Sequence, residues 1–145
     1  MDKLKVLFVC SRNAGRSQMA EAFLRRFAGD AFEVESAGLD PAPEVLPLVR
    51  QVMAEEGLDL SGKKPQSVFD LFRQGRLYDY VIAVCDTATA ESCPVFPGVT
   101  QRWRWPFPDP EAVAGTPEER LAKVRAIRDM VREKVERPFS EQTEA

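Results

Sequence analysis

The 145-residue sequence contains no histidine. That absence excludes Cys–His and Ser–His–Asp catalysis, as well as zinc sites with histidine ligands. A catalytic proton donor must then be a carboxylic acid, Tyr, Lys or Cys. Cysteine is also scarce, because Cys10, Cys85 and Cys93 are the three thiols of the sequence, too few for an all-cysteine tetrahedral zinc site. A nucleophilic or redox role is the remaining chemical use of these cysteines.

The sequence also lacks an excess of basic residues and a long apolar run. Its net charge of −3 argues against nucleic acid as a partner. The apolar run at residues 6–9 is far shorter than the roughly 20 residues that span a bilayer, and it enters Cys-Ser-Arg-Asn instead of a signal-peptide cleavage site. We therefore expect a cytoplasmic protein with reduced thiols, no membrane partner and a monomeric state.

Hydrophobic patterning predicts strands that alternate with helices. The expected strands cover residues 4–9, 32–37, 80–84 and 99–104. The expected helices cover residues 17–28, 44–56, 68–74 and 116–137, with Pro47 in a first turn, Ser67 as an N-cap and Thr116-Pro-Glu-Glu as a helix start. A further short helical turn is expected within 87–92. Residues 1–138 then form a single domain, and 139–145 form a frayed tail.

The same periodicity predicts which helical residues face the core. The apolar series from Met19 to Phe27 and the series from Leu121 to Val131, which includes Met130, are expected to point inward. Alternating strands and helices predict an α/β protein with a doubly wound parallel sheet. Ligands of such sheets bind beyond the carboxyl ends of the strands, where Cys10 and Cys85 are expected to lie.

The segment that follows the first strand has the composition of a phosphate-binding loop. Between a strand and a helix, successive backbone N–H groups can surround a tetrahedral anion. The expected oxyanion-binding residues are Ser11, Arg12, Asn13, Ala14, Gly15 and Arg16. Ala14 and Gly15 permit close approach, and the planar guanidinium of Arg16 matches two oxygens of the anion. The side chain of Arg12 has a simpler alternative role as a solvated charge at the rim.

Cys10 is the candidate nucleophile of this loop. A helix N-terminus beside an arginine favours the thiolate form of a cysteine. Ser17 is expected to hydrogen-bond the sulfur, and Asn13 tolerates the left-handed backbone needed to tie the loop together. The alternative is a merely buried cysteine followed by an exposed arginine. The preceding strand, the following helix, the small residues and Ser17 favour the catalytic interpretation.

Asp109 is the candidate general acid, because a leaving oxygen needs a proton and no histidine supplies one. Its neighbours Pro108 and Pro110 are expected to stiffen the segment that carries the carboxyl group. By itself an Asp-Pro step is more often only a turn.

Residues 6–23, Val-Leu-Phe-Val-Cys-Ser-Arg-Asn-Ala-Gly-Arg-Ser-Gln-Met-Ala-Glu-Ala-Phe, resemble the opening of the low-molecular-weight tyrosine phosphatase superfamily. The run 16–21 resembles its arsenate reductase branch, of the thioredoxin-coupled type. Residues 33–38, 109–110 and 115–119 also resemble that branch, so the similarity covers nearly the whole chain. The resemblance implies a three-layer fold, a four-stranded parallel sheet flanked by helices, and a general acid in the Asp-Pro step.

The resemblance also implies a thiol relay that reduces arsenate to arsenite. Cys10 attacks arsenate, Cys85 attacks the adduct, and Cys93 then attacks Cys85 to leave a disulfide. Phosphate and sulfate are expected to compete with arsenate. Thioredoxin, or glutaredoxin with glutathione, is expected to reduce the disulfide. Seven residues separate Cys85 from Cys93, one more than expected in the best-matched reductases.

Two other functions remain open at this stage. A tyrosine phosphatase would form a phosphocysteine at Cys10 and would favour aromatic residues after Pro110, where Glu-Ala-Val-Ala stands instead. Trp103 and Trp105 are better explained by packing than by a substrate pocket. A non-enzymatic oxyanion-binding or redox-sensing module would need the loop but not Asp109.

We predict no cofactor and no metal. Some members of the branch that this sequence resembles bind a potassium ion near the loop. Asn13, Glu21 and Ser36 match the potassium ligands, but Gln66 stands where an aspartate is expected.

Overall fold

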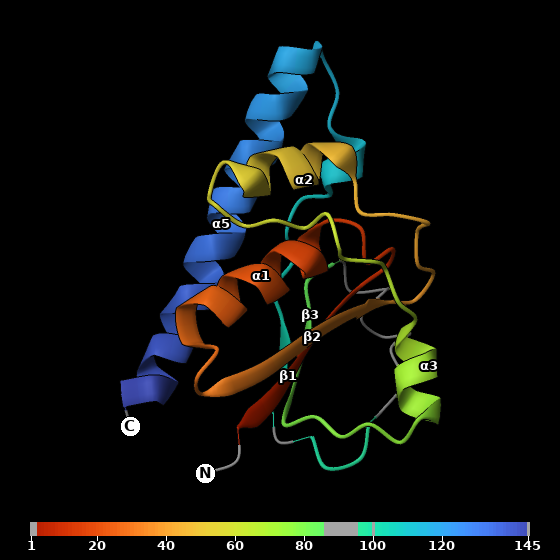
Figure 1. The fold of residues 1–145 in the computed structure, drawn as a ribbon, viewed down its shortest axis with the longest axis vertical. Coiled ribbons are helices and arrows are strands. Elements are labelled where there is room, and N and C mark those ends of the chain that lie inside the picture. The colour runs from red at the N-terminus through yellow and green to blue at the C-terminus, as the bar shows by residue number, and fades with distance from the viewer. Residues whose placement is uncertain (1–2, 86–95, 100, 145) are drawn as a thin grey trace.

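Four parallel strands form the centre of the computed structural model, which describes residues 3–85, 96–99 and 101–144, and side chains as far as residue 137 (Figure 1). The strands are β1 (Leu4–Cys10), β2 (Phe32–Gly38), β3 (Tyr80–Ala83) and β4 (Gln101–Arg104). Their order in the sheet is β2-β1-β3-β4, and every neighbouring pair is parallel. The predicted α/β fold with a four-stranded parallel sheet is therefore confirmed.

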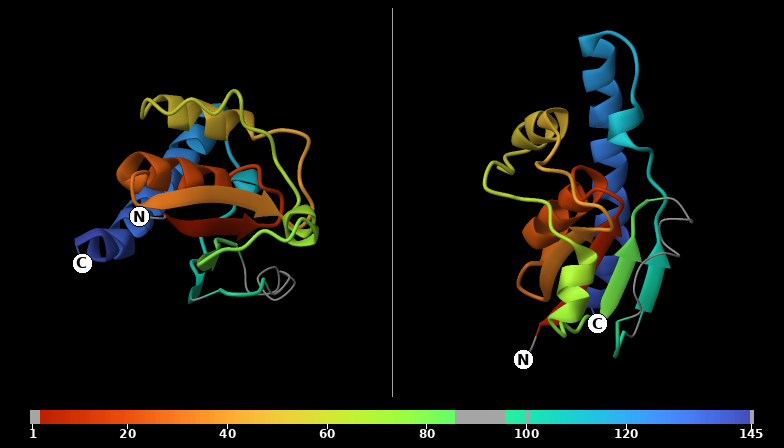
Figure 2. Two further views of the ribbon diagram at one scale, coloured as in Figure 1. Left: turned by 60° about the horizontal axis from the view of Figure 1, so that its bottom comes forward. Right: turned by 90° about the vertical axis from the view of Figure 1, so that its right-hand side faces the viewer.

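Helices cover both faces of this sheet (Figure 2). They are α1 (Arg16–Ala28), α2 (Pro47–Ala54), α3 (Val68–Arg73) and α5 (Pro117–Glu144), with a short 3-10 helix, η1, at Pro110–Ala112. Helices α1, α2 and α5 share one hydrophobic core with one face of the sheet, whereas α3 packs on the opposite face. The three predicted layers are thus present.

Strand β1 is buried on both faces. Val6 and Phe8 belong to the core under α1 and α5, and Leu7 and Val9 belong to the core under α3. All four side chains are completely inaccessible. The sequence of a central parallel strand is a continuous apolar run because neither face of the strand meets water.

The helix starts follow the capping chemistry of the sequence. The hydroxyl of Ser67 accepts hydrogen bonds from the amides of Phe69 and Asp70 at the start of α3. At the start of α5, Thr116 Oγ1 accepts from the Glu119 amide at 3.1 Å, and the Glu119 carboxylate accepts from the Thr116 amide at 3.3 Å. This reciprocal pair satisfies two N–H groups that a bare helix end would leave unbonded.

Two helix boundaries differ from the prediction by more than two residues. Helix α2 starts at Pro47 and not at residue 44, because Pro47 takes the first helical position and Leu46 before it is extended. Helix α5 continues to Glu144 instead of ending near Arg137. Good helix formers, mainly Glu, Arg and Lys, precede Pro138, and Glu141, Gln142 and Glu144 follow it.

Two side chains that were expected to face the core are exposed: Phe27 by 41% and Met130 by 47%. In α1 the buried stripe ends at Ala28, which places Phe27 at its edge. In α5 the stripe follows Val124, Ile127, Val131 and Val135, which leaves Met130 at the border of a surface hollow. A stripe only a few residues wide buries some members of an apolar series and not others.

No helix in the described parts of the chain is long and apolar enough to cross a membrane.

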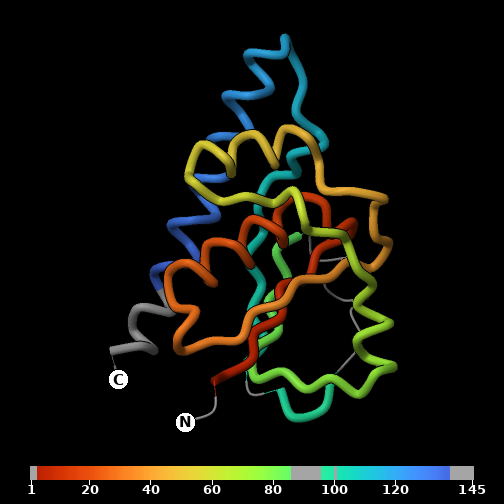
Figure 3. Tube along the Cα trace, in the orientation of Figure 1, coloured from red at the N-terminus to blue at the C-terminus, as the bar shows by residue number. Residues whose placement is uncertain are grey.

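Strands β1 and β2 end at the same edge of the sheet, the edge at which α1 begins (Figure 3). Cys10 and Gly38 are the last paired residues of these two strands. Whatever follows Cys10 in sequence is therefore placed directly above the carboxyl ends of the strands, where parallel α/β sheets bind ligands.

Candidate active site

The loop from Cys10 to Arg16 is held from behind by the segment that follows β2. The carbonyl oxygens of residues 10, 11, 12 and 14 accept hydrogen bonds from the amides of residues 39, 40, 42 and 46, at 2.7–3.1 Å. In a trans peptide the N–H of the next residue points to the side opposite the carbonyl. Anchoring the carbonyls outward therefore turns loop amides inward, which is the arrangement that binds an anion.

Asn13 fixes the shape of this loop. Its φ of 53° lies in the left-handed region, which asparagine tolerates better than most residues. Its Nδ2 donates to Ser17 Oγ at 2.7 Å, and its Oδ1 accepts from the Gln66 amide at 2.9 Å and from Gln18 Nε2 at 3.1 Å. Asn13 is completely buried, so these bonds satisfy polar atoms that water does not reach.

Cys10 is 2% exposed, and its sulfur lies inside the loop. The Asn13 amide donates to Sγ at 3.1 Å, and Ser17 Oγ lies 2.9 Å from Sγ. Ser17 Oγ also accepts from Asn13 Nδ2, and it donates to Sγ when Cys10 is a thiolate, because a thiolate has no hydrogen to donate. Two donors aimed at one sulfur stabilise negative charge on it.

Arg16 joins the loop to the segment that carries Asp109. Its Nη1 donates to the Phe107 carbonyl at 3.2 Å, and its Nη2 lies 3.9 Å from Asp109 Oδ1. The Arg16 side chain is only 10% exposed. Arg12 is placed differently, because its Nη1 binds the Asp40 carboxylate at 2.9 Å and its side chain is 41% exposed.

Asp109 and the loop line one small pocket. The loop contributes Cys10, Arg12, Ala14, Gly15 and Arg16, and the facing segment contributes Asp109, Pro110 and Glu111. The Asp109 side chain is 43% exposed, and its Oδ1 accepts from the Glu111 amide at 2.9 Å. A carboxyl group at the mouth of this pocket is able to exchange protons with a ligand beside Cys10.

Gly15 permits the loop and the Asp109 segment to approach each other closely. A Cβ atom at this position would meet Pro110 Cγ at 2.7 Å. No side chain other than hydrogen fits there without displacing Pro110, and a displaced Pro110 would carry its neighbour Asp109 away from the loop.

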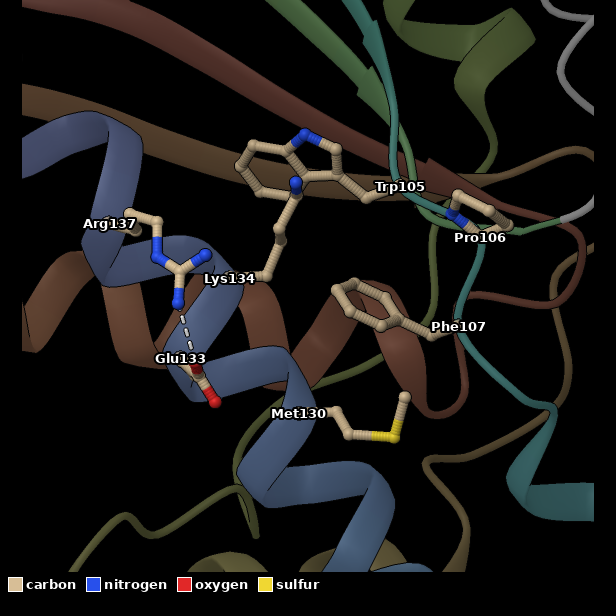
Figure 4. Close-up of a pocket in the computed structure, with 7 residues that line it drawn as sticks. All are labelled: Trp105, Pro106, Phe107, Met130, Glu133, Lys134 and Arg137. Carbon is tan, nitrogen blue, oxygen red and sulfur yellow. Dashed lines mark hydrogen bonds and ion pairs between the residues drawn. The ribbon is translucent and has the colours of Figure 1, made fainter.

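Two aromatic side chains that shortly precede Asp109 in sequence, Trp105 and Phe107, lie beside α5 (Figure 4). Trp105 and Phe107 are buried against α5, where they line a hollow together with Met130 and Lys134. The ammonium of Lys134 lies 5.7 Å from the centre of the Trp105 ring, and the Trp105 amide donates to the Ala83 carbonyl at 2.8 Å. Figure 4 shows Phe107 turned toward α5, which leaves its backbone carbonyl to accept from Arg16.

Cys85 lies at the carboxyl end of β3, beside the end of β1. It is 1% exposed, and its Sγ is 3.9 Å from the Val9 carbonyl. The neighbouring Val84 amide donates to the same carbonyl at 2.9 Å. Cys10 and Cys85 thus follow adjacent strands at one edge of the sheet. Cys93 and the turn predicted within 87–92 lie outside the described residues.

Gly38 is a site residue that composition and spacing did not single out. A Cβ atom on Gly38 would lie 2.8 Å from the Asn13 nitrogen and 2.9 Å from the Arg12 carbonyl carbon. The loop therefore rests directly on the backbone of the neighbouring strand. The available signal was a glycine at the carboxyl end of the predicted second strand, but its register against Cys10 became visible only in the sheet.

The fold and the pocket define a class of protein: a parallel α/β domain with a buried cysteine and an arginine in a strand-to-helix loop whose carbonyls are anchored outward. The chain belongs to the low molecular weight phosphotyrosine protein phosphatase family, whose family model matches residues 5–139. It is an enzyme of this superfamily.

Relatives with known names agree with one branch of the family. An arsenate reductase from Halalkalibacterium halodurans is 35% identical over 135 residues, 93% of this chain and 94% of that protein. A crystal structure of an arsenate reductase from Archaeoglobus fulgidus has a TM-score of 0.73 at 30% identity, covering 93% of this chain and 98% of that one.

A thioredoxin-dependent arsenate reductase from Corynebacterium glutamicum is a third relative. Its structure has a TM-score of 0.62 at 31% identity, and the match covers 92% of this chain and 62% of that chain.

Proposed function

We propose that this enzyme reduces arsenate to arsenite with Cys10 as the nucleophile. The observation that carries the proposal is the convergence of the Cys10 sulfur, the Arg16 guanidinium and the Asp109 carboxyl on one pocket. Relatives that are about one-third identical over nearly the full chain are named arsenate reductases. Their names support arsenate as the oxyanion.

The first step forms an arsenic–sulfur bond. Loop amides and Arg16 bind the arsenate oxygens, and the Cys10 thiolate attacks arsenic. One oxygen leaves as water after receiving a proton from Asp109. Arsenic is still arsenic(V) in this adduct, so the step is a substitution and needs no reductant.

The second step transfers the electrons. The Cys85 thiolate attacks the Cys10 sulfur, an S–S bond forms, and the S–As bond breaks with its electron pair moving to arsenic. Arsenite, arsenic(III), then leaves. Cys93 attacks the Cys85 sulfur of this disulfide, which releases Cys10 as a thiolate and leaves a Cys85–Cys93 disulfide. The adjacent strand ends that carry Cys10 and Cys85 support the first exchange.

A dithiol protein of the thioredoxin type is the proposed reductant of the final disulfide. The thioredoxin dependence of the Corynebacterium glutamicum relative supports this choice. Glutathione with glutaredoxin is the alternative, and it would leave a mixed disulfide with glutathione on the enzyme.

Mass spectrometry after one arsenate turnover tests the relay. Reduced enzyme is mixed with arsenate, quenched with an alkylating reagent and digested. We expect a Cys85–Cys93 bridge and alkylated Cys10. A glutathione adduct formed in the presence of glutathione would instead favour the glutaredoxin route. Full arsenate turnover by Cys85→Ser would contradict the relay.

Weak phosphatase activity is a second candidate function, because an oxyanion loop with an acid beside it suits phosphate as well as arsenate. The described residues that follow Pro110 provide Glu111 at the pocket mouth and no aromatic surface for a phosphotyrosine ring. Cys85→Ser separates the two activities. We expect this variant to hydrolyse p-nitrophenyl phosphate as the wild type does while losing arsenate reduction.

A further inference from the structure

A buried carboxylate lies beneath the oxyanion loop, on the α1 side of β2. Glu21 is 2% exposed. Its Oε1 accepts from Ser36 Oγ at 2.7 Å, and its Oε2 lies 2.5 Å from Lys63 Nζ and 2.9 Å from Arg25 Nη2. Two cationic side chains therefore neutralise one carboxylate that water scarcely reaches.

A continuous series of hydrogen bonds joins this carboxylate to the catalytic loop. The Ser36 carbonyl accepts from Gln66 Nε2 at 2.9 Å, and the Gln66 amide donates to Asn13 Oδ1 at 2.9 Å. Asn13 then binds Ser17, which contacts the Cys10 sulfur. Lys63 and Gln66 belong to the same short segment before α3, so fixing Lys63 on Glu21 also fixes Gln66 on Asn13.

The residues that match potassium ligands of some relatives do not fit a potassium ion here. Asn13 Oδ1 already accepts two N–H groups, from Gln66 and Gln18. The Glu21 carboxylate already contacts a hydroxyl and two cations. Among the residues that the structure describes, no three His, Cys, Asp or Glu side chains gather closely enough to hold a metal ion.

The surrounding charge also disfavours a further cation. The hollow beside Glu21 is lined by three positive side chains, Lys63, Arg25 and Arg26, against two negative ones, Glu21 and Asp59. A potassium ion entering it would meet more positive than negative charge at short range.

We propose that the Lys63 ammonium takes the place of a bound monovalent cation, and that Lys63 is a positioning residue for the oxyanion loop. It neutralises Glu21 permanently and holds the Ser36–Gln66–Asn13 connection to the loop. The enzyme is consequently independent of potassium.

Loss of this ammonium creates a vacancy that a cation suits. Glu21 Oε2 loses its shortest contact in Lys63→Met. Gln18, whose Oε1 is the one buried side-chain acceptor without a hydrogen-bond partner in the described part of the chain, belongs to the lining of the same hollow. Without the Lys63 charge, Arg25 and Arg26 face Glu21 and Asp59 in this hollow, so the excess of positive charge that opposed a monovalent cation is removed.

Thermal unfolding in KCl and in choline chloride at equal ionic strength tests the proposal. We expect one Tm for the wild type in both salts. K63M is expected to melt about 4–8 °C lower in choline chloride, a shift typical of losing a partly buried ion-pair partner, and to recover at least half of that loss in KCl. K63R keeps the charge and is expected to be as insensitive to the salt as the wild type.

Lys64→Met is the matched control, since Lys64 is the exposed neighbour of Lys63. It is expected to leave the Tm unchanged in both salts. If K63M fails to fold, the Tm of Lys63→Gln, which keeps a hydrogen-bond donor without the charge, is compared in the same two salts.

A second measurement separates positioning from plain stability. Iodoacetamide is expected to alkylate Cys10 several-fold more slowly in K63M than in the wild type in choline chloride, well below the Tm, and KCl is expected to restore the rate. Higher wild-type stability in KCl than in choline chloride, or a K63M protein that ignores KCl in both measurements, would overturn the proposal. Neither measurement uses arsenate, so failure here is distinct from failure of the proposed function.

Discussion

At the scale of single residues, the proposed reactivity of Cys10 depends on the hydrogen bonds that its sulfur makes. Ser17 Oγ lies beside this sulfur and accepts from Asn13 Nδ2, which orients its hydroxyl to donate to a Cys10 thiolate. The serine that follows the arginine of the loop thus acts through its geometry and not through reactivity of its own.

Ser17→Ala is expected to slow alkylation of Cys10 by iodoacetamide at neutral pH by about tenfold, because a hydrogen bond to a charged acceptor contributes about 1.5–3 kcal/mol. Ser11→Ala, which removes a hydroxyl from the same loop but not the one beside the Cys10 sulfur, is the control. An unchanged alkylation rate in S17A would show that the hydroxyl does not stabilise the thiolate.

Asp109→Asn tests proton donation. We expect turnover of arsenate and of phenyl phosphate to fall by about 10²–10⁴-fold, the usual contribution of a general acid. Hydrolysis of p-nitrophenyl phosphate, whose leaving group needs little protonation, is expected to fall much less. Alkylation of Cys10 in the same variant is the control. Equal losses on both phosphate esters would argue against Asp109 as the acid.

At the scale of secondary-structure elements, the loop is shaped by the strand beside it and by the segment after that strand. Hydrogen bonds from residues 39–46 hold four of its carbonyls, and the bare backbone of Gly38 lies under its middle. The anion site is therefore a joint product of β1, β2 and their connections, and it depends on their register.

Gly38→Ala is expected to push the loop outward, because the added Cβ would lie within 3 Å of the Arg12 and Asn13 backbone. Overpacking of this kind costs about 1–3 kcal/mol, and we expect affinity for phosphate to fall about tenfold, as measured by calorimetry. Gly62→Ala, whose Cβ meets nothing within 4 Å, is the matched control. Unchanged phosphate affinity in G38A would contradict the close packing.

Helices α2 and α5 are joined by the Glu55 carboxylate. Arg125 Nη2 donates to it at 2.6 Å and Arg128 Nη1 at 2.8 Å. The hydrogen bond from Arg125, with a smaller contribution from Arg128, lowers the pKa of Glu55 from 4.5 to about 2. Because the pKa is lower in the folded state, the stabilisation is complete above pH 4.5 and is lost as the pH falls toward 2.

Glu55→Gln is expected to unfold at a lower urea concentration than the wild type at pH 7. The difference is expected to shrink as the pH falls through the interval below 4.5 and to shrink in high salt, since these side chains are partly exposed. Urea unfolding at several pH values measures it. A difference that stays constant down to about pH 2 would show that the charge of Glu55 plays no part.

At the scale of the whole molecule, the proposed oxyanion site would link ligand binding to folding. The loop, the β2 connection and the Asp109 segment come from three distant parts of the chain and meet only in the folded protein. An anion that binds this assembly and not the unfolded chain must raise the stability of all of it.

Phosphate and arsenate at about 100 times their dissociation constants are expected to add about 2.7 kcal/mol, which corresponds to a rise in Tm of about 5–10 °C. Sodium chloride at the same ionic strength is the control. Arg16→Met is expected to abolish the rise, and differential scanning fluorimetry measures it. A wild-type Tm that does not respond to either oxyanion would contradict the anion site.

The sequence alone determined the elements and the chemical identity of the loop. The apolar run of β1 and the caps at Ser67 and Thr116 were predicted from local patterns, because capping and periodicity act over a few residues. The loop composition singled out Cys10 and Arg16 as candidates, and the family resemblance singled out Asp109. The exposure of Phe27 and Met130 and the continuation of α5 past Pro138 were missed, because neighbouring elements decide them.

Only the tertiary structure decided what surrounds the loop. The contact of Gly38 with the loop backbone, the support of Phe107 against α5 and the pairing of Lys63 with Glu21 join residues far apart in the chain. No local pattern encodes such distances, since they follow from strand register and from how the layers pack. The sequence determined which groups are candidates for the chemistry, and the packing determined where they meet and that Lys63 pairs with the Glu21 carboxylate.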